Sequence, residues 1–362
     1  MFQKRRENLL SLMKEREMDA VVFVPGSNLY YFTGLKLKQS ERLTLAILAR
    51  DGKLTFLAPQ VELSKVETVA NKSTFWYTDE EGPANAISQL KEHAGSLGIV
   101  GVEFGYMRVM EQKAAEAIGY ENLVDLSHCI NELRMQKEAN EIELMKKAVQ
   151  IVEESLEATL DYIKPGAVEI EIAAQLEYEM RRRGSEGTPF GTIVASGYRG
   201  ALPHGRAADK KIESGDLIVL DFGSIYKGYV ADITRTVAVG EISDELKKVY
   251  EIVKKANETA IEAVKPGVTA HDIDETARSI IREAGFGQYF THRLGHGLGL
   301  SAHEDPYMMQ QNNLVLKSGM AFTIEPGIYL KDKGGVRIED NIIVTEEGHL
   351  NLMSYTKDLI VL

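Results

Sequence analysis

The stretch LIVLDFGSIYKGYVADITRTVAV, residues 217–239, decides the fold of this 362-residue chain. Two runs rich in Val, Ile and Leu flank the turn SIYKG, which predicts a β-hairpin. Asp221 and Asp232 are symmetric about a point between residues 226 and 227, so a hairpin centred there sets the two acids opposite each other. Cross-strand neighbours have Cβ atoms about 4.5–5.5 Å apart. Two carboxylates this close on apolar strands repel one another unless a cation lies between them.

A second hairpin repeats this design nearer the C-terminus. MAFTIEPG (320–327) leads through IYLKDKGG to VRIEDNIIV (336–344), and Glu325 and Glu339 are symmetric about Asp332. We expect the four acids of the two hairpins to converge on one site. Such a set of oxygen donors suits a pair of hard divalent cations about 3.5–4 Å apart.

The two hairpins belong to an internal repeat. IKPGAVEIEIAAQLEYEMRRRG starts at Ile163, and VKPGVTAHDIDETARSIIREAG starts at Val264 in an ungapped register. Each half predicts a helix, a Lys-Pro-Gly turn, an amphipathic helix and a glycine stop. The first of these helices is the long amphipathic pattern over 137–162. The pattern predicts an α+β domain built from two structurally related halves.

The residues before this repeat alternate strand and helix patterns, which predicts a mixed α/β domain. Short strands are expected at 19–24, 43–49, 54–57 and 99–104, and helices at about 3–17, 60–70, 84–94 and 107–118. The aromatic segment NLYYFTG (28–34) fits either a packed loop or a contact with a ligand or a second subunit. We place the first domain at 1–128 and the second at 129–362.

Composition excludes several function classes. The 42 basic and 54 acidic residues give a formal net charge of −12, which argues against nucleic-acid and anionic-membrane partners. The lone Cys129 cannot form an internal disulfide, and we expect a small buried hydrophobic side chain rather than a reactive thiol. Neither a secretory leader pattern nor a run of about 20 apolar residues is present. These observations predict a cytoplasmic protein.

Histidines complete the donor set. THRLGHGLGLSAHEDP (291–306) holds His292, His296 and His303 among closely spaced glycines, and His204 lies in ALPHG upstream of the first hairpin. A single buried Asp or His is more often structural than catalytic. Four acids at mirrored positions beside a histidine cluster favour a metal site instead. The DFG at 221–223 lacks the other kinase motifs, and the glycine run lacks the dinucleotide-binding pattern.

The segments ALPHG, LDFGSIYKGYVADITRT, HRLGHGLGLSAHE, TIEPGIY and GGVRIED resemble the creatinase/prolidase branch of the M24 metallopeptidases, and the resemblance covers the whole chain. It implies a pita-bread catalytic domain with an internal pseudo-twofold repeat, behind a creatinase/prolidase-like N-terminal domain. The metal ligands that it implies are Asp221, Asp232, His296, Glu325 and Glu339. Asp232 and Glu339 would bridge two ions, Asp221 would complete one site, and His296 and Glu325 the other.

The resemblance also implies roles in peptide hydrolysis. Two metal ions would make hydroxide available near neutral pH, and Glu325 would accept and pass on its proton. His204 and His303 would hold the oxyanion and the substrate carbonyl. Arg337 would pair with a carboxylate of the site or of the substrate, and His292 would line the proline pocket. Four carboxylates with one imidazole favour Mn²⁺, with Co²⁺ and Zn²⁺ as alternatives.

The expected activity is hydrolysis of the Xaa-Pro bond at the N-terminus of short peptides by a homodimeric metalloprotease. The short 14-residue spacing from Glu325 to Glu339 and the compact N-terminal domain resemble microbial Xaa-Pro dipeptidases (prolidases) more than the longer Xaa-Pro aminopeptidases. Against this choice, HEDPYMMQ (303–310) contains no Arg to hold the C-terminal carboxylate of a dipeptide. A non-catalytic scaffold is disfavoured because all five ligands are present. Methionine aminopeptidase is disfavoured by the long N-terminal domain.

Overall fold

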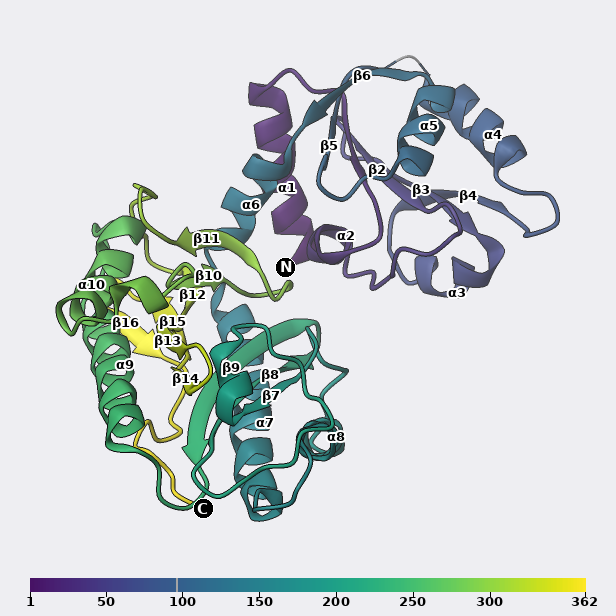
Figure 1. Cartoon of the computed structure of the whole chain (residues 1–362). Helices are drawn as coiled ribbons and strands as arrows, with labels where there is room; N and C mark the ends of the chain where they lie inside the picture. Colours follow the sequence, from purple (N-terminus) through teal and green to yellow (C-terminus); the bar gives the residue numbers. More distant parts are fainter. Residues whose placement is uncertain (96) are drawn as a thin grey trace. The chain divides into compact units, whose positions relative to one another are not determined.

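The computed structural model describes residues 1–95 and 97–362 and divides into two units, Met1–Arg134 and Met135–Leu362 (Figure 1). The sequence-based boundary at residue 128 falls six residues earlier, inside helix α6 (Ser127–Met135). Most of this helix belongs to the first unit because its side chains pack there. Arg134 donates a hydrogen bond to the side chain of Asn28 at 2.6 Å, and the carbonyl of Leu133 accepts one from Tyr31 at 2.8 Å.

The first unit is a six-stranded mixed sheet in the order β4-β3-β2-β1-β5-β6 with helices packed against it. Its strands are β1 (Ala20–Phe23), β2 (Leu45–Ala49), β3 (Leu54–Pro59), β4 (Lys72–Tyr77), β5 (Leu97–Val102) and β6 (Tyr120–Asp125). Its helices are α1 (Phe2–Glu15), α2 (Ser27–Thr33), α3 (Leu63–Val66), α4 (Ala84–Ala94), α5 (Val109–Ile118) and α6. The α/β class predicted from the sequence is confirmed, but the edge strands β4 and β6 were not predicted.

The aromatic segment at 28–34 is a helix rather than a loop. Helix α2 ends at Gly34, whose φ of 77° gives the left-handed conformation that closes many helices. Leu29 and Phe32 on this helix are fully buried, and the Phe32 ring stacks on Phe23 of β1 at 5.0 Å. Most of these apolar side chains therefore contribute to packing within the unit.

The second unit contains two similar halves. The first half has α7 (Ala139–Thr159), α8 (Glu169–Arg182) and a sheet of β7 (Ile193–Ser196), β8 (Leu217–Tyr226) and β9 (Tyr229–Ala238). The second half has α9 (Asp244–Glu262), α10 (Ala270–Glu283), a sheet in the order β11-β10-β12-β15-β16 and the pair β13-β14. Their bounds are β10 (Gly295–Gly297), β11 (Glu304–Met308), β12 (Ala321–Ile324), β13 (Gly327–Leu330), β14 (Gly334–Arg337), β15 (Asp340–Val344) and β16 (His349–Asn351).

The internal repeat seen in the sequence is present in the fold. Helices α8 and α10 begin at residues 169 and 270 and end at 182 and 283, so they keep the offset of 101 residues at both ends. The matching turn residues Gly166 and Gly267 have φ values of 90° and 92°. Their N–H groups donate to the carbonyls of Ile212 and Leu316 at 2.8 and 3.0 Å, so the two turns are anchored in the same way.

In each half, one face of the sheet packs on the helices. On β8, Ile218, Leu220 and Phe222 share a buried cluster with residues of α7 and α8. On β12, Phe322 and Ile324 share another with residues of α9 and α10 (Figure 1). Because side chains alternate along a strand, Asp221 projects from the opposite face of β8. None of the helices in the described part of the chain has the length and apolar character to cross a bilayer.

The register of the first hairpin differs from the sequence prediction. Tyr226 pairs with Tyr229, so the turn is the two-residue Lys227-Gly228, whose φ values are 48° and 86°. Two consecutive residues with positive φ are typical of the turns that join tight hairpins. Asp221 therefore faces Thr234 and not Asp232. The register is shifted by two residues, so both acids keep the same face as diagonal neighbours.

The second hairpin has the predicted symmetry. Ile324 pairs with Asp340, and Gly327 pairs with Arg337, so both pairs are symmetric about Asp332. Glu325 and Glu339 lie in the gap between these paired segments. Their backbone N–H groups instead donate to the carbonyls of Leu294 and Thr234, at 2.8 and 3.1 Å. Glu339 is thus attached to β9 of the first half.

Candidate metal centre

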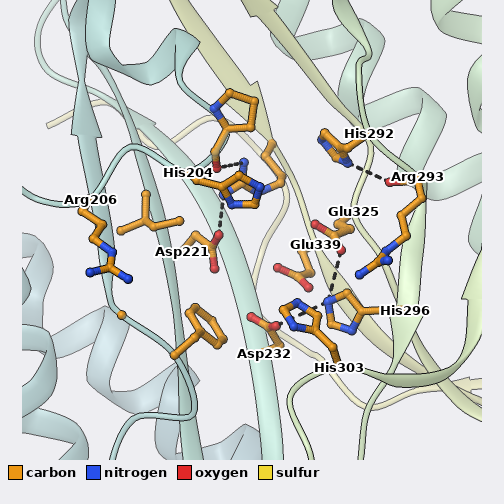
Figure 2. A pocket seen from close by; sticks show the side chains of 15 residues that line it. His204, Arg206, Asp221, Asp232, His292, Arg293, His296, His303, Glu325 and Glu339 are labelled. Carbon is orange, nitrogen blue, oxygen red and sulfur yellow. Dashed lines mark hydrogen bonds and ion pairs between the residues drawn. The ribbon is translucent and has the colours of Figure 1, made fainter. Parts of the chain in front are cut away.

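A cavity of about 600 Å³ opens in the second unit (Figure 2). All nine candidate residues named from the sequence line it. These are His204, Asp221, Asp232, His292, His296, His303, Glu325, Arg337 and Glu339. They come from both halves of the repeat, with Asp221 and Asp232 on the first hairpin and Glu325 and Glu339 on the second.

Three of these residues form a tight donor cluster. Ligand atoms of Asp232, His296 and Glu339 lie within 4.8 Å of one another, and the three side chains are at most 4% exposed. The His296 Nε2 atom lies 3.9 Å from Asp232 Oδ2 and 3.3 Å from Oε1 of Glu325. His296 Nδ1 is 3.0 Å from the Gly297 carbonyl, which can only accept, so Nδ1 carries the proton and Nε2 offers its lone pair to the cluster.

Two carboxylate oxygens in this cluster have no hydrogen-bond partner among the residues that the structure describes. Asp232 Oδ1 and Glu339 Oε1 are buried and unsatisfied. A buried carboxylate oxygen without a donor is costly, and most such atoms in proteins are paired or coordinate a cation. The donor set of hard oxygens with one neutral imidazole therefore fits a divalent metal ion.

The pKa shifts follow from burial and mutual repulsion. Burial raises the pKa of Asp232 well above its usual range, and the nearby charges of Asp221 and Glu325 raise it further. Burial and the charge of Asp232 do the same to Glu339. Burial raises the pKa of Glu325 to about 7 and lowers the pKa of His296 to about 3. Without a cation the cluster resists full ionisation, while His296 is already in the neutral form that binds metals.

Hydrogen bonds fix the acids from behind. The Asn341 side chain donates to the backbone carbonyl of Asp232 at 2.6 Å and accepts from its N–H at 3.1 Å. The Thr234 hydroxyl donates to Glu339 Oε2 at 2.7 Å, and the Thr323 hydroxyl lies 3.2 Å from Glu325 Oε1. These contacts hold the carboxylates in place and leave their other oxygens directed to the cavity.

The glycines on either side of His296 are required by close backbone packing. A Cβ atom on Gly295 would lie 1.9 Å from the carbonyl oxygen of Thr323, and one on Gly297 would lie 2.1 Å from that of Asp305. Both distances are far below van der Waals contact. The short strand β10 therefore fits between its neighbours only with glycine at these positions, and this places the imidazole in the cluster.

The guanidinium of Arg337 donates hydrogen bonds to other groups of the protein. Its guanidinium pairs with Asp221 and donates to the Tyr329 hydroxyl at 2.7 Å and to the Pro203 carbonyl at 3.2 Å. Tyr329 in turn contacts Nε2 of His292 at 2.8 Å. Tyr329 was not named from the sequence. It joins Arg337 and His292 in one hydrogen-bonded chain along the cavity wall.

The remaining histidines, His204 and His303, also line the cavity. The ring of His303 makes an edge contact with His296 at a centroid distance of 4.2 Å, and burial lowers its pKa. His204 is exposed at the rim and follows the short turn Gly197–Ala201 (Figure 2). Sequence reasoning missed two arginines of the cavity wall, Arg206 and Arg293. The second could have been found, since it lies inside the histidine cluster HRLGH.

Comparison with known proteins agrees with this geometry. The model of metallopeptidase family M24 matches residues 143–346, and that of the creatinase/prolidase N-terminal domain matches 5–136. An Xaa-Pro dipeptidase of Pyrococcus furiosus is 40% identical over 361 residues, which is 99% of this chain and 100% of that protein.

Solved structures extend the likeness to the fold. A prolidase from Thermococcus sibiricus is 38% identical with a TM-score of 0.95, covering 100% of this chain and 99% of that one. An X-Pro aminopeptidase from Thermotoga maritima is 35% identical with a TM-score of 0.88, covering 98% and 99%. The predicted N-terminal α/β unit and pita-bread catalytic unit are confirmed. With its buried Asp, His and Glu cluster able to hold a metal, this chain belongs to metallopeptidase family M24.

Proposed function

We propose that this chain is a metal-dependent dipeptidase that hydrolyses the bond before proline in Xaa-Pro dipeptides. The observation that carries the proposal is the pair of buried carboxylate oxygens without partners, Asp232 Oδ1 and Glu339 Oε1. The likeness to the Xaa-Pro dipeptidase of Pyrococcus furiosus, 40% identical to this chain, supports the substrate class.

The five donors fit two divalent cations, for which we propose Mn²⁺, with Co²⁺ and Zn²⁺ as substitutes. Asp232, His296 and Glu339, whose ligand atoms cluster most tightly, would hold these ions together with Asp221 and Glu325. Bound ions of this kind lower the pKa of water to about 7 and polarise a carbonyl group.

The chain's own residues then move the protons. Glu325 is the proposed proton acceptor and donor because its carboxylate lines the cavity, with Oε1 3.3 Å from Nε2 of His296. A carboxylate in that position can take a proton from a nucleophilic water and pass it to the leaving nitrogen. His303, packed on His296, and His204 at the rim would donate hydrogen bonds to the oxygen of the scissile carbonyl as its negative charge grows.

Positioning falls to the cavity wall. Arg337 pairs with Asp221 and so orients that carboxylate. Because its charge is paired in this way, binding of the substrate falls to other residues of the cavity. His292 is held by Tyr329, and with Phe190 and Ile193 it lines the same cavity, where these apolar surfaces suit a proline ring. The acids at the centre would receive the substrate's free ammonium group, which restricts cleavage to the first residue of a peptide.

A second candidate is an Xaa-Pro aminopeptidase that acts on longer peptides. It is favoured by the likeness to the Thermotoga maritima X-Pro aminopeptidase, at 35% identity. Turnover of Ala-Pro against Ala-Pro-Ala separates the two. Equal or better turnover of the tripeptide would replace the first candidate by the second. We further propose a homodimer, which light scattering of the purified protein would test.

The metal requirement is tested with two conservative variants and a matched control. Asp232→Asn and Glu339→Gln keep the shape of the side chains but remove a charge that the cluster needs. Both should lose bound metal and at least about 100-fold in Ala-Pro turnover. Asp332→Asn makes the same kind of change at the exposed tip of the second hairpin and should keep metal and activity. Full activity in the first two variants would contradict the proposed site.

A further inference from the structure

The loop between β10 and β11 carries a histidine of the cavity at each end. His296 lies on β10, and His303 lies directly before β11, where Figure 2 shows the two rings next to each other. Among the residues that the structure describes, none forms a hydrogen bond with the His303 ring. The direction of this imidazole therefore depends on the backbone that bears it, residues 298–303.

The side chain of Glu304 closes this loop. One carboxylate oxygen, Oε2, accepts a hydrogen bond from the backbone N–H of Ser301 at 3.3 Å. The other, Oε1, accepts one from Nζ of Lys137 at 2.6 Å. Because Glu304 follows His303 directly, the two side chains leave an extended backbone on opposite sides. The imidazole lines the cavity, and the carboxylate is bound behind it.

Lys137 is itself fixed to the segment that leads into β12. Its backbone N–H donates to the carbonyl of Gly319 at 2.7 Å, and the side chain of Gln136 donates to the carbonyl of Ser318 at 2.8 Å. The side chains of Lys137 and Glu304 are only 2% and 7% exposed. An ammonium and a carboxylate at this depth occur as a pair, because either alone would carry a large desolvation cost. Such pairs add little net stability, which favours a geometric role.

The backbone of the loop packs directly on this ion pair. A Cβ atom on Gly299 would lie 2.8 Å from Oε1 of Glu304 and 2.8 Å from Cε of Lys137. The carbonyl of Gly299 also accepts a hydrogen bond from the N–H of Val230 on β9 at 2.7 Å. The loop is thus attached to β9 and in close contact with the ion pair, so a shift of the pair displaces the loop.

The first half of the unit holds its cavity histidine in a similar way. The carboxylate of Glu169 is fully buried and accepts hydrogen bonds from one loop. Its donors include the N–H of Ser196 at 2.7 Å, Nε of Arg199 at 2.9 Å and the N–H of Ala208 at 3.2 Å. These donors lie on both sides of His204 in the sequence. In each half, a buried carboxylate paired with a cation therefore closes the loop that bears the histidine.

We propose that Lys137 and Glu304 are positioning residues for His303, because their ion pair holds the 298–303 loop and thereby aims the imidazole into the cavity. The inference rests on the proposed function, in which His303 donates a hydrogen bond to the oxygen of the scissile carbonyl. In the described part of the chain, neither residue of the pair lines the cavity. A donor aimed at a charge that grows during the reaction acts on kcat more than on KM.

The experiment removes both charges together, so that neither partner is left buried and unpaired. Lys137→Met combined with Glu304→Gln is the uncharged variant. Loaded with Mn²⁺, it should keep its metal and its KM for Ala-Pro within about twofold, while kcat falls about 10- to 100-fold. The control, Lys254→Met, removes the lysine of an ion pair with Asp358 on α9, outside the cavity, and should keep the wild-type kcat.

A comparison in the His303→Ala background shows whether the pair acts through His303. His303→Ala alone should lower kcat by about 100-fold. Adding the two substitutions of the uncharged variant to His303→Ala should lower kcat by less than a further factor of about two, because the group that they position is gone. If kcat instead falls by the same factor in both backgrounds, the ion pair does not act through His303 and the proposal is overturned.

Hydrogen exchange of the metal-free protein gives a measurement that does not depend on activity. Peptides that cover residues 298–304 should exchange at least about 10-fold faster in the uncharged variant than in the wild type. Peptides from the hairpin at 217–238 should keep their wild-type rates. Unchanged exchange over 298–304 would mean that the ion pair does not hold the loop, which also overturns the proposal.

The remaining outcomes separate this inference from the proposed function. A wild-type enzyme loaded with Mn²⁺ that does not cleave Ala-Pro contradicts the proposed function, whereas the exchange rates still decide whether the pair holds the loop. A His303→Ala variant with wild-type kcat overturns the positioning role and leaves the peptidase proposal intact. If the uncharged variant does not load metal, Gly299→Ala replaces it in both comparisons, because its new Cβ displaces the same ion pair without removing a charge. A wild-type kcat in Gly299→Ala would then overturn the proposal.

Discussion

Removal of metal should make the folding stability of this protein fall as the pH rises, and Glu325 allows the size of the effect to be worked out. Burial raises the pKa of Glu325 from 4.5 to about 7. The two pKa values differ by about 2.5, and each unit is worth about 1.36 kcal/mol, so the free energy at stake is about 3 kcal/mol.

The sign follows from proton binding. Between about pH 4.5 and pH 7, the folded protein holds a proton on Glu325 that the unfolded chain has lost. Raising the pH through this window therefore favours the unfolded chain. The contribution is fully present below the unfolded pKa and is lost as the pH passes the folded pKa. Asp232 and Glu339 have raised pKa values as well and act in the same direction.

Urea denaturation of the chelator-treated protein, followed by circular dichroism at about pH 5 and pH 8, measures this loss. The same pair of measurements on Glu325→Gln removes the contribution of that group and the part of the rise in the pKa of Asp232 and Glu339 that its charge causes. The wild type should lose about 2–3 kcal/mol more than the variant between the two pH values. The single tryptophan, Trp76 in the first unit, reports separately on a unit that lacks the site.

Two results would refute the reasoning. One is an equal pH dependence in the wild type and Glu325→Gln after metal removal. The other is a wild-type protein whose free energy of unfolding depends on pH in the same way with saturating Mn²⁺ as with chelator. Bound cations should hold the carboxylates in their ionised form, so the loss of stability between about pH 5 and pH 8 should disappear when Mn²⁺ is present.

Three further outcomes follow from contacts in the second unit. Gly297→Ala should destabilise the protein by more than about 2 kcal/mol and lower its metal content, because the new Cβ would lie 2.1 Å from a carbonyl oxygen. The control is Gly348→Ala, whose new Cβ meets nothing within 4 Å and should leave the stability unchanged. Thermal unfolding of the two variants measures the difference. Asn341→Ala removes both hydrogen bonds to the Asp232 backbone and should weaken Mn²⁺ binding about 10- to 100-fold in calorimetric titration. Asp340→Asn leaves the buried Arg235 and the partly buried Lys357 without their counter-charge and should cost about 3–5 kcal/mol near neutral pH, with a smaller cost in acid.

The hairpins show how far a sequence pattern predicts a site. Symmetry placed Glu325 opposite Glu339 correctly, because the register on both sides of them is centred on Asp332. The same reasoning misplaced Asp221 against Asp232 by two residues. Side chains alternate with a period of two, so an even shift kept both acids on the face of the cavity. The face of the sheet on which each carboxylate lies was therefore predictable. The cross-strand partner of each acid depended on the tight turn at Lys227.

Other features depended on tertiary contacts that a pattern does not show. Helix α2 is rich in aromatic residues, which have no strong helical preference, and it is stabilised by burial of Phe32 against the sheet. The contact of the Arg293 guanidinium with the Tyr307 ring joins residues that lie 14 positions apart in the sequence and meet through the path of β10 and β11. Site residues at mirrored positions could be found from the sequence. The residues that contact and position them could not.

The hydrogen bonds from Asn341 to the Asp232 backbone and from Thr234 to Glu339 hold these acids using protein groups alone. Because these donors are groups of the chain itself, we expect the fold to set the arrangement of the carboxylates in the same way for each ion that the site could take. Oxygen donors with one imidazole also discriminate weakly among the first-row divalent metals. We therefore expect the metal found in the purified protein to depend on which divalent ions are supplied to it.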